Sequence, residues 1–178
     1  MCIVIDINVL SMVFNESNER HAEFVAVREW IDARKGYLVF GGTTYKAELA
    51  KAIRYFRLVR LLYDGGKAIS ILDAVVDKIE NEVCKKLEKS NCDDPHIIAL
   101  LGASRCSLLC SADSRSFEFI KDRNLYPKGA PRVRIYSSPR NVSLLTKSDP
   151  RKLVNRSGSG LTFQHFQLNS AHGQAIEN

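Results

Sequence analysis

The sequence predicts an α/β fold in three layers, with a mostly parallel central sheet of about five strands between two layers of helices. Short apolar runs of strand length recur along the chain, and segments with the apolar spacing of helices separate them. Strands that alternate with helices form right-handed βαβ units and place helices on both faces of a parallel sheet. The chain has 178 residues, 45% of them hydrophobic and 26% charged, and is long enough to bury one globular core.

The first strand and the first helix are predicted near the N-terminus. Residues 3–5 are apolar and β-branched, as in a central strand that is covered on both faces, and the run stops at Asp6. A helix is expected over 18–34. Asn18 is a favourable N-cap for this helix, and Gly36 follows its C-terminal end.

The next two strands enclose a second helix. Residues 37–40 predict the second strand, and the turn at 41–44 opens a helix that continues to about Tyr63. Residues 68–72 predict the third strand, which leads into a long helix. The apolar residues of this long helix recur at intervals of three and four positions: Leu72, Val76, Ile79, Val83 and Leu87.

Two more strands complete the predicted sheet. A helix is expected over 94–103, with Pro95 at its first helical position. Residues 107–110 then predict the fourth strand, residues 114–122 a short helix, and residues 133–136 a fifth strand framed by prolines.

The composition favours a cytoplasmic protein that meets polyanions. The net charge is +6, and most of the basic excess lies in the C-terminal third of the chain. Five cysteines without a Cys-x-x-Cys motif are typical of reduced thiols. A signal peptide and an apolar stretch long enough to span a bilayer are both missing from the sequence, so we expect no membrane association.

One domain is expected over residues 1–147, followed by a polar tail over 148–178. Residues 157–160 alternate serine and glycine, and the end of the chain contains few apolar residues, which favours a poorly ordered segment. Residues 161–168 are more apolar, so docking of this stretch on the domain or on a partner is the alternative.

Four acidic residues stand at corresponding places in the predicted elements. Asp6 and Asp113 follow strands, and Glu48 and Asp94 lie in the first turns of helices. In a parallel sheet these places fall at the carboxyl ends of the strands, where open α/β sheets bind ligands. Four carboxylates that share a crevice repel one another unless a cation or protons neutralise them. The pattern therefore predicts a site for a divalent metal.

The order of these motifs resembles the PIN domain family of metal-dependent ribonucleases. The matching motifs are Asp6-Ile7-Asn8 after the first strand, Glu48 on a helix, Asp94 ahead of an Ile-Ile-Ala run, and Ser111-Ala112-Asp113 after the fourth strand. The resemblance covers residues 2 to about 140. The chain departs from some members of the family in having Ser114-Arg115-Ser116-Phe117, without an acid, directly after Asp113.

The resemblance implies an endoribonuclease that uses one or two Mg²⁺ or Mn²⁺ ions and leaves a 5′-phosphate and a 3′-hydroxyl. Asp6 and Asp94 would be the central ligands, Asp113 a ligand directly or through water, and Glu48 a ligand or the base that positions water. Asn8 and Ser111 would donate hydrogen bonds that orient the carboxylates. The arginines expected to hold RNA phosphates are Arg54, Arg57, Arg60 and Arg115.

Similarity to toxins of bacterial toxin-antitoxin pairs would add a cognate antitoxin protein and a homodimer as partners. Three alternatives remain open: a DNA-directed nuclease with the same site, a catalytically inactive PIN-like module that binds RNA or protein, and, more distantly, a phosphoacceptor receiver domain.

Structural roles could also account for individual residues of the motifs. Asp94 and Asp113 could be simply helix N-caps, Glu48 an exposed helix residue, and the three arginines of residues 54–60 a solvated face. We expect His96 to be a surface or cap-adjacent residue, because no second histidine accompanies it.

Overall fold

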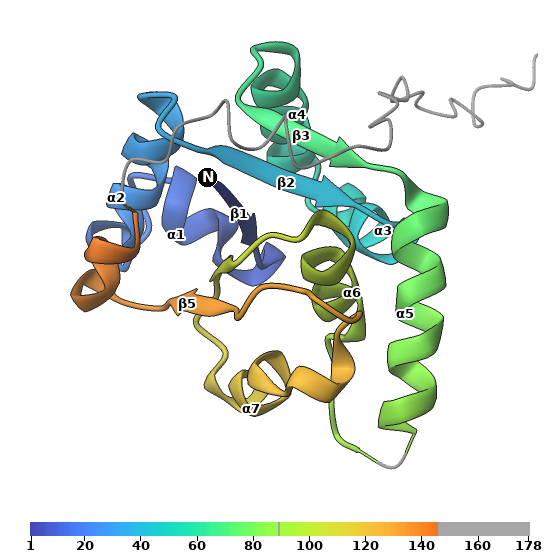
Figure 1. The fold of residues 1–178 in the computed structure, drawn as a ribbon. Coiled ribbons are helices and arrows are strands. Elements are labelled where there is room, and N and C mark those ends of the chain that lie inside the picture. Colours follow the sequence, from blue (N-terminus) through green and yellow to red (C-terminus); the bar gives the residue numbers. More distant parts are fainter. Residues whose placement is uncertain (89, 146–178) are drawn as a thin grey trace, which may run out of the picture.

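A computed structural model describes residues 1–88 and 90–145 of the chain and shows a parallel sheet of five strands (Figure 1). The strand order is β3-β2-β1-β4-β5, and every neighbouring pair is parallel. In the register, Val4 of the central strand lies opposite Val39 on one side and Leu109 on the other. The strands are β1 (Cys2–Ile5), β2 (Tyr37–Gly41), β3 (Ala68–Ile71), β4 (Leu108–Cys110) and β5 (Arg134–Tyr136).

Helices connect consecutive strands and cover both faces, so the predicted three-layer α/β fold is confirmed. The α1–α2 pair and the α5–α6 pair pack within themselves and lie on opposite sides of the sheet (Figure 1). The α-helices are α1 (Leu10–Phe14), α2 (His21–Asp32), α3 (Thr43–Lys51), α4 (Ile53–Asp64), α5 (Asp73–Leu87), α6 (Pro95–Ser104) and α7 (Phe117–Lys121). Short 3₁₀ helices are η1 (Ile7–Val9), η2 (Ser114–Ser116), η3 (Arg123–Leu125) and η4 (Pro139–Leu144).

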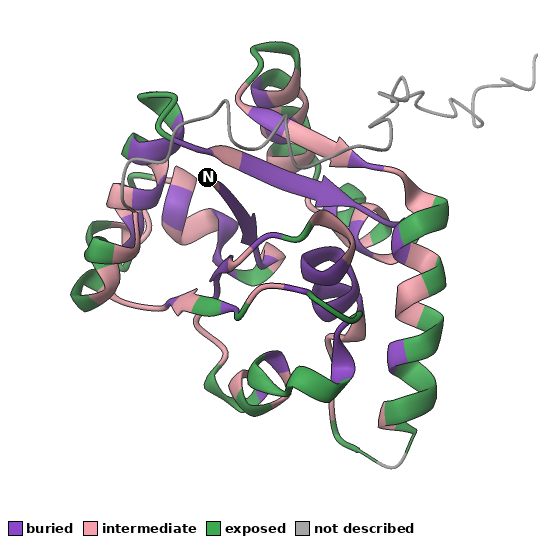
Figure 2. Cartoon of the chain, in the orientation of Figure 1, coloured by how far each residue is buried: buried purple, intermediate pink, exposed green. Residues whose placement is uncertain are grey.

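The core is apolar on both sides of the central strand, which explains the unbroken apolar run in the sequence. Ile3, Val4 and Ile5 of β1 are fully buried. In Figure 2, β1, β2 and α6 are almost entirely purple, whereas the outer side of α5 is green. Helix α6 is buried all round because the sheet lies on one side of it and α5 on the other.

Two expectations about helices were wrong. The helix predicted from the turn at 41–44 to Tyr63 is two helices, since the backbone leaves helical geometry at Ala52 (φ −99°, ψ 65°). The break lets α3 and α4 bury their apolar residues in different directions. The helix predicted over 18–34 begins only at His21, because the Asn18 side chain accepts from the Arg20 N–H and closes a turn ahead of it. Helix α1 was not predicted.

The glycines after β2 make the sharp entry into α3 possible. Gly42 has φ 83°, a left-handed conformation, and a Cβ there would lie 2.6 Å from Cγ1 of Val76 on α5. The backbone N–H of Gly42 donates to Asp73 and that of Thr43 to Asp77, so the turn is held against the start of α5.

Within the described part of the chain, no helix is both long enough and apolar enough to cross a membrane. The predicted tail at 148–178, including the apolar stretch 161–168, lies outside the described residues.

Candidate active site

The strand order creates a switch point between β1 and β4. From β1 the chain proceeds through β2 to β3 on one side, and then returns to place β4 on the other side of β1. Ligand crevices in open α/β sheets form at such a point, outside the carboxyl ends of the strands. Asp6 directly follows β1, and Ser111 and Asp113 follow β4. These three residues therefore lie at the switch point.

Asp6 is buried, with only 5% of its surface exposed, and its carboxylate is held on both oxygens. The Ser111 hydroxyl donates to Oδ2 of Asp6 at 2.9 Å. The backbone N–H of Asn8 donates to Oδ1 at 3.1 Å and so caps η1. The exposed residue Asn8 thus orients Asp6 through its main chain. Ser111 also accepts a hydrogen bond from the N–H of Asp113 and links the two acids.

Asp94 occupies the N-cap position of α6, with Pro95 following it, yet its side chain makes no capping hydrogen bond. Partial burial raises the pKa of this carboxyl, and the negative charges of Asp6, Glu48 and Asp113 raise it further, while His96 acts in the opposite direction. The Asp94 carboxyl therefore lies close enough to the other three acids for each of them to repel its negative charge.

Glu48 on α3 reaches the same region through His96. Its Oε2 lies 3.5 Å from Nε2 of His96, a residue that is only 3% exposed. The ring of Tyr45, one turn before Glu48, packs near His96, and the buried Tyr45 hydroxyl donates to the carbonyl of Ile5 at 2.8 Å. Helix α3 is thereby fastened to the end of β1, beside Asp6.

Asp113 is paired with an arginine two residues along the chain. Nε and one terminal nitrogen of Arg115 donate to the two carboxylate oxygens at 3.0 and 2.8 Å, and the Arg115 backbone N–H donates to Oδ1. This pair lowers the pKa of Asp113. Asp94, Asp113 and Arg115 all line one open cleft of about 820 Å³, together with Asp93, Glu118 and Phe119.

The donor chemistry of the four acids fits Mg²⁺ or Mn²⁺, which prefer carboxylate oxygens. The orientation of the four side chains, however, does not form a metal site. Within residues 1–88 and 90–145, no three His, Cys, Asp or Glu side chains are gathered so that they could hold a metal ion. The contacts above account for this: Asp113 is engaged by Arg115, and Glu48 faces His96. The side chains would have to turn toward a cation.

The predicted RNA-binding arginines separate into two groups. Arg54, Arg57 and Arg60 lie on α4, which packs against the edge strand β3, and Arg115 alone of the four lines the acidic cleft. Arg54 reaches Asn15, and Arg60 pairs with Asp64 at 2.9 Å.

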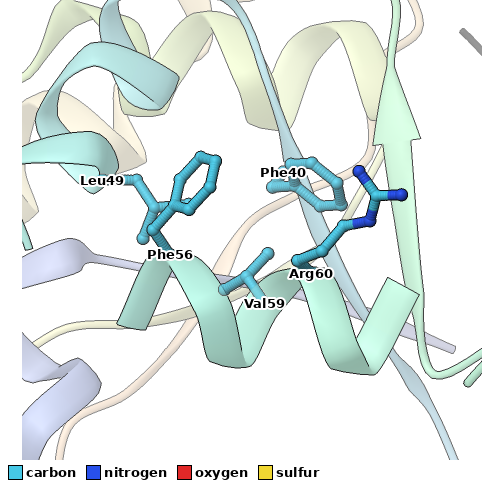
Figure 3. Close-up of a pocket in the computed structure, with 5 residues that line it drawn as sticks. All are labelled: Phe40, Leu49, Phe56, Val59 and Arg60. Carbon is cyan, nitrogen blue, oxygen red and sulfur yellow. The ribbon is translucent and has the colours of Figure 1, made fainter. Parts of the chain in front are cut away.

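The carbon stem of Arg60 also has a packing role. It closes a gap of about 10 Å³ between α4, α3 and β2, walled otherwise by Phe40, Leu49, Phe56 and Val59 (Figure 3). A gap of this size admits about one water molecule, and its walls are apolar, so it is a packing defect and not a ligand site.

His96 and Tyr45 are the residues of this site that sequence reasoning missed. The expectation that His96 is a surface or cap-adjacent residue holds for its place, two residues after the N-cap Asp94, but its side chain is buried and not at the surface. The apolar run that follows it, Ile97 to Leu101, is the signal that could have placed it inside, because a helix that is apolar all round is buried. Comparisons of the chain with protein-family models and with curated proteins find no match.

Proposed function

We propose that this protein is a divalent-metal-dependent endoribonuclease of the PIN-like type, which hydrolyses phosphodiester bonds to leave a 5′-phosphate and a 3′-hydroxyl. The observation that carries the proposal is the environment of Asp94, a partly buried, uncapped carboxyl whose pKa is raised by burial and by the charges of Asp6, Glu48 and Asp113. A partly buried carboxyl whose pKa is raised by neighbouring acids, at a ligand-binding edge of a sheet, is typical of functional sites.

Each acid has a role that its surroundings support. Asp6 is held in one rotamer by Ser111 and the Asn8 backbone, as suits a fixed ligand, and Asp94 has no competing cap. Asp113 becomes a third ligand when Arg115 releases it. The Glu48 side chain is 41% exposed, and its Oε2 lies 3.5 Å from Nε2 of His96. Glu48 would therefore be able to position the attacking water.

A bound Mg²⁺ or Mn²⁺ would supply a more acidic water and positive charge beside the phosphorus. The chain would supply the orientation of the ligands, and Arg115 would supply a contact to a substrate phosphate, since it is the predicted phosphate-binding arginine that lines the cleft. The formal charge of +6 favours a polyanionic substrate. A role as a toxin, a cognate antitoxin and a homodimer belong to the same proposal and rest on the resemblance in sequence. A cytoplasmic location belongs to it too and rests on the composition of the chain.

The test compares Asp94→Asn with Asp93→Asn on labelled single-stranded RNA and DNA in the presence of Mn²⁺. Asp93 is the neighbouring, exposed acid and serves as a matched control for charge. Loss of residues that merely orient metal ligands typically costs about 10- to 100-fold in activity or affinity, so we expect Asp94→Asn to lose at least that much RNA cleavage and Asp93→Asn to keep most of it.

Other outcomes favour the alternatives. Cleavage of DNA alone would identify a DNA-directed nuclease. Binding of RNA without any cleavage by the wild-type protein would identify an inactive module, an alternative that the pairing of both Asp113 oxygens with Arg115 specifically favours. Equal cleavage by both variants would place the reaction elsewhere.

A further inference from the structure

Arg115 is held over the acidic cleft by contacts to a proposed metal ligand. Its guanidinium meets both oxygens of Asp113 in a fork, the geometry in which arginine binds a carboxylate most specifically. The side chain is nevertheless 82% exposed, at the rim of the cleft that it lines. The contact therefore orients the Asp113 carboxylate, while the exposed Arg115 side chain remains able to leave it for another anion.

Arg115 is also the positive charge that this cleft contains. Among the described residues that line it, Asp93, Asp94, Asp113 and Glu118 are acidic and Arg115 alone is basic. Asp93 and Asp94 act on the guanidinium electrostatically in addition to Asp113. A cation that enters the cleft therefore meets an internal competitor for Asp113.

We infer that Arg115 is a tethered counter-ion, which a divalent cation displaces from Asp113 and which then binds the substrate phosphate. This inference rests on the proposed function and deepens it. The guanidinium and a metal ion compete for the same two oxygens of Asp113, and their like charges repel, so the binding of one weakens the hold of the other. The guanidinium, once released, retains its fork of donors, which fits two oxygens of a phosphodiester.

The exchange couples the two ligands. A phosphodiester that occupies Arg115 frees Asp113 for the cation, and a cation on Asp113 frees Arg115 for the phosphodiester. Linkage requires that each ligand strengthens the binding of the other by the same factor. The arrangement would weaken the binding of cations until a phosphodiester occupies Arg115.

The test measures Mn²⁺ affinity by calorimetry in wild type, Arg115→Gln, Arg115→Lys and Arg123→Gln, with Mn²⁺ as the sole ligand. Arg123 is exposed and does not line the cleft, so its variant controls for the general loss of a positive charge. We expect Arg115→Gln to bind Mn²⁺ roughly two- to fivefold more tightly than wild type, the range that an exposed ion pair supports. Arg115→Lys should lie between the two, because lysine lacks the fork.

A second titration adds dimethyl phosphate, a phosphodiester without a nucleoside, against sodium chloride at matched ionic strength. Dimethyl phosphate should tighten Mn²⁺ binding in wild type and have little effect in Arg115→Gln. Equal Mn²⁺ affinity in wild type and Arg115→Gln, or an equal gain in Arg123→Gln, overturns the inference. The proposed function fails separately, if wild type and Asp94→Asn bind Mn²⁺ alike.

Discussion

At the scale of single residues, the candidate site depends on which of the acids accept hydrogen bonds from the backbone and from neighbouring side chains. Asp6 and Asp113 each accept a backbone N–H two residues ahead and cap the 3₁₀ helices that follow them. Asp94 stands at the start of α6 but caps nothing. The capping explanation was the alternative for Asp94 and Asp113. It holds for Asp113, and also for Asp6, but not for Asp94. The second oxygens of Asp6 and Asp113 accept from Ser111 and Arg115.

Ser111→Ala should destabilise the protein and weaken Mn²⁺ binding. Ser111 is 1% exposed, and without its hydroxyl the buried Asp6 carboxylate loses a donor on Oδ2. Leaving a buried polar group without its partner costs about 1–3 kcal/mol, and urea denaturation would measure the loss. Ser114→Ala, at an exposed position, is the control and should leave the free energy of unfolding nearly unchanged. Equal stability of the two variants would contradict the role of Ser111.

Asp94→Asn should raise Tm in EDTA at neutral pH, by a small amount of the order of 2 °C. The raised pKa means that the fold prefers the neutral carboxyl. The stability contributed by that preference is complete below the unfolded pKa of about 3.9 and is lost as the pH rises through the folded pKa. The difference in Tm between Asp94→Asn and wild type should therefore grow from pH about 4 upward. A difference that is constant with pH would argue against repulsion at Asp94.

At the scale of elements, the junctions decide where the acids point. Helix α3 is separate from α4, begins at the glycine turn after β2, and is tied to β1 by the hydroxyl of Tyr45. If α3 and α4 formed one straight helix, the direction of α4 would set the orientation of Glu48. Helix α6 begins at Pro95, directly after Asp94. Its apolar surface is covered by α5 and by the sheet, and this packing fixes the position of its N-terminal end. Two separate helices, α3 and α6, therefore bring Glu48 together with Asp94 and His96.

Gly42→Ala should destabilise the junction between β2 and α3 more than Gly66→Ala destabilises its turn. Both glycines have positive φ, 83° and 67°, so alanine is strained at both positions. Gly42 also has ψ 145°, outside the αL region, and a Cβ there would meet Val76 at 2.6 Å, whereas a Cβ at position 66 has nothing within 4 Å. Urea denaturation of the two variants measures the difference in the free energy of unfolding, and equal losses would contradict the prediction.

At the scale of the whole molecule, the parallel sheet places all four acids at one edge, and folding supplies most of the repulsion among them. A cation that binds the folded chain and not the unfolded chain offsets that repulsion and stabilises the fold by mass action. The open cleft of about 820 Å³ leaves the region accessible to both a cation and a polymeric substrate.

Mn²⁺ should raise the Tm of wild type in proportion to the logarithm of its concentration above the dissociation constant. At about 100 times that constant, the gain is about 2.7 kcal/mol, which corresponds to several degrees. Asp94→Asn should show a much smaller rise, and EDTA should reverse the effect in wild type. An equal rise in both proteins would mean that Mn²⁺ stabilises the fold at some other place.

The sequence by itself determined the fold class, the five strands and, to within one residue, where they end, because apolar runs, turn residues and helix spacing are local properties of the chain. Only the tertiary structure decided that β4 lies beside β1. This pairing brings the hydroxyl of Ser111 to Asp6, a residue 105 positions away. The break at Ala52 and the approach of Glu48 to His96 are of the same kind. Their physical reason is that strand pairing and helix direction depend on which surfaces meet, and no local pattern in the sequence encodes those meetings.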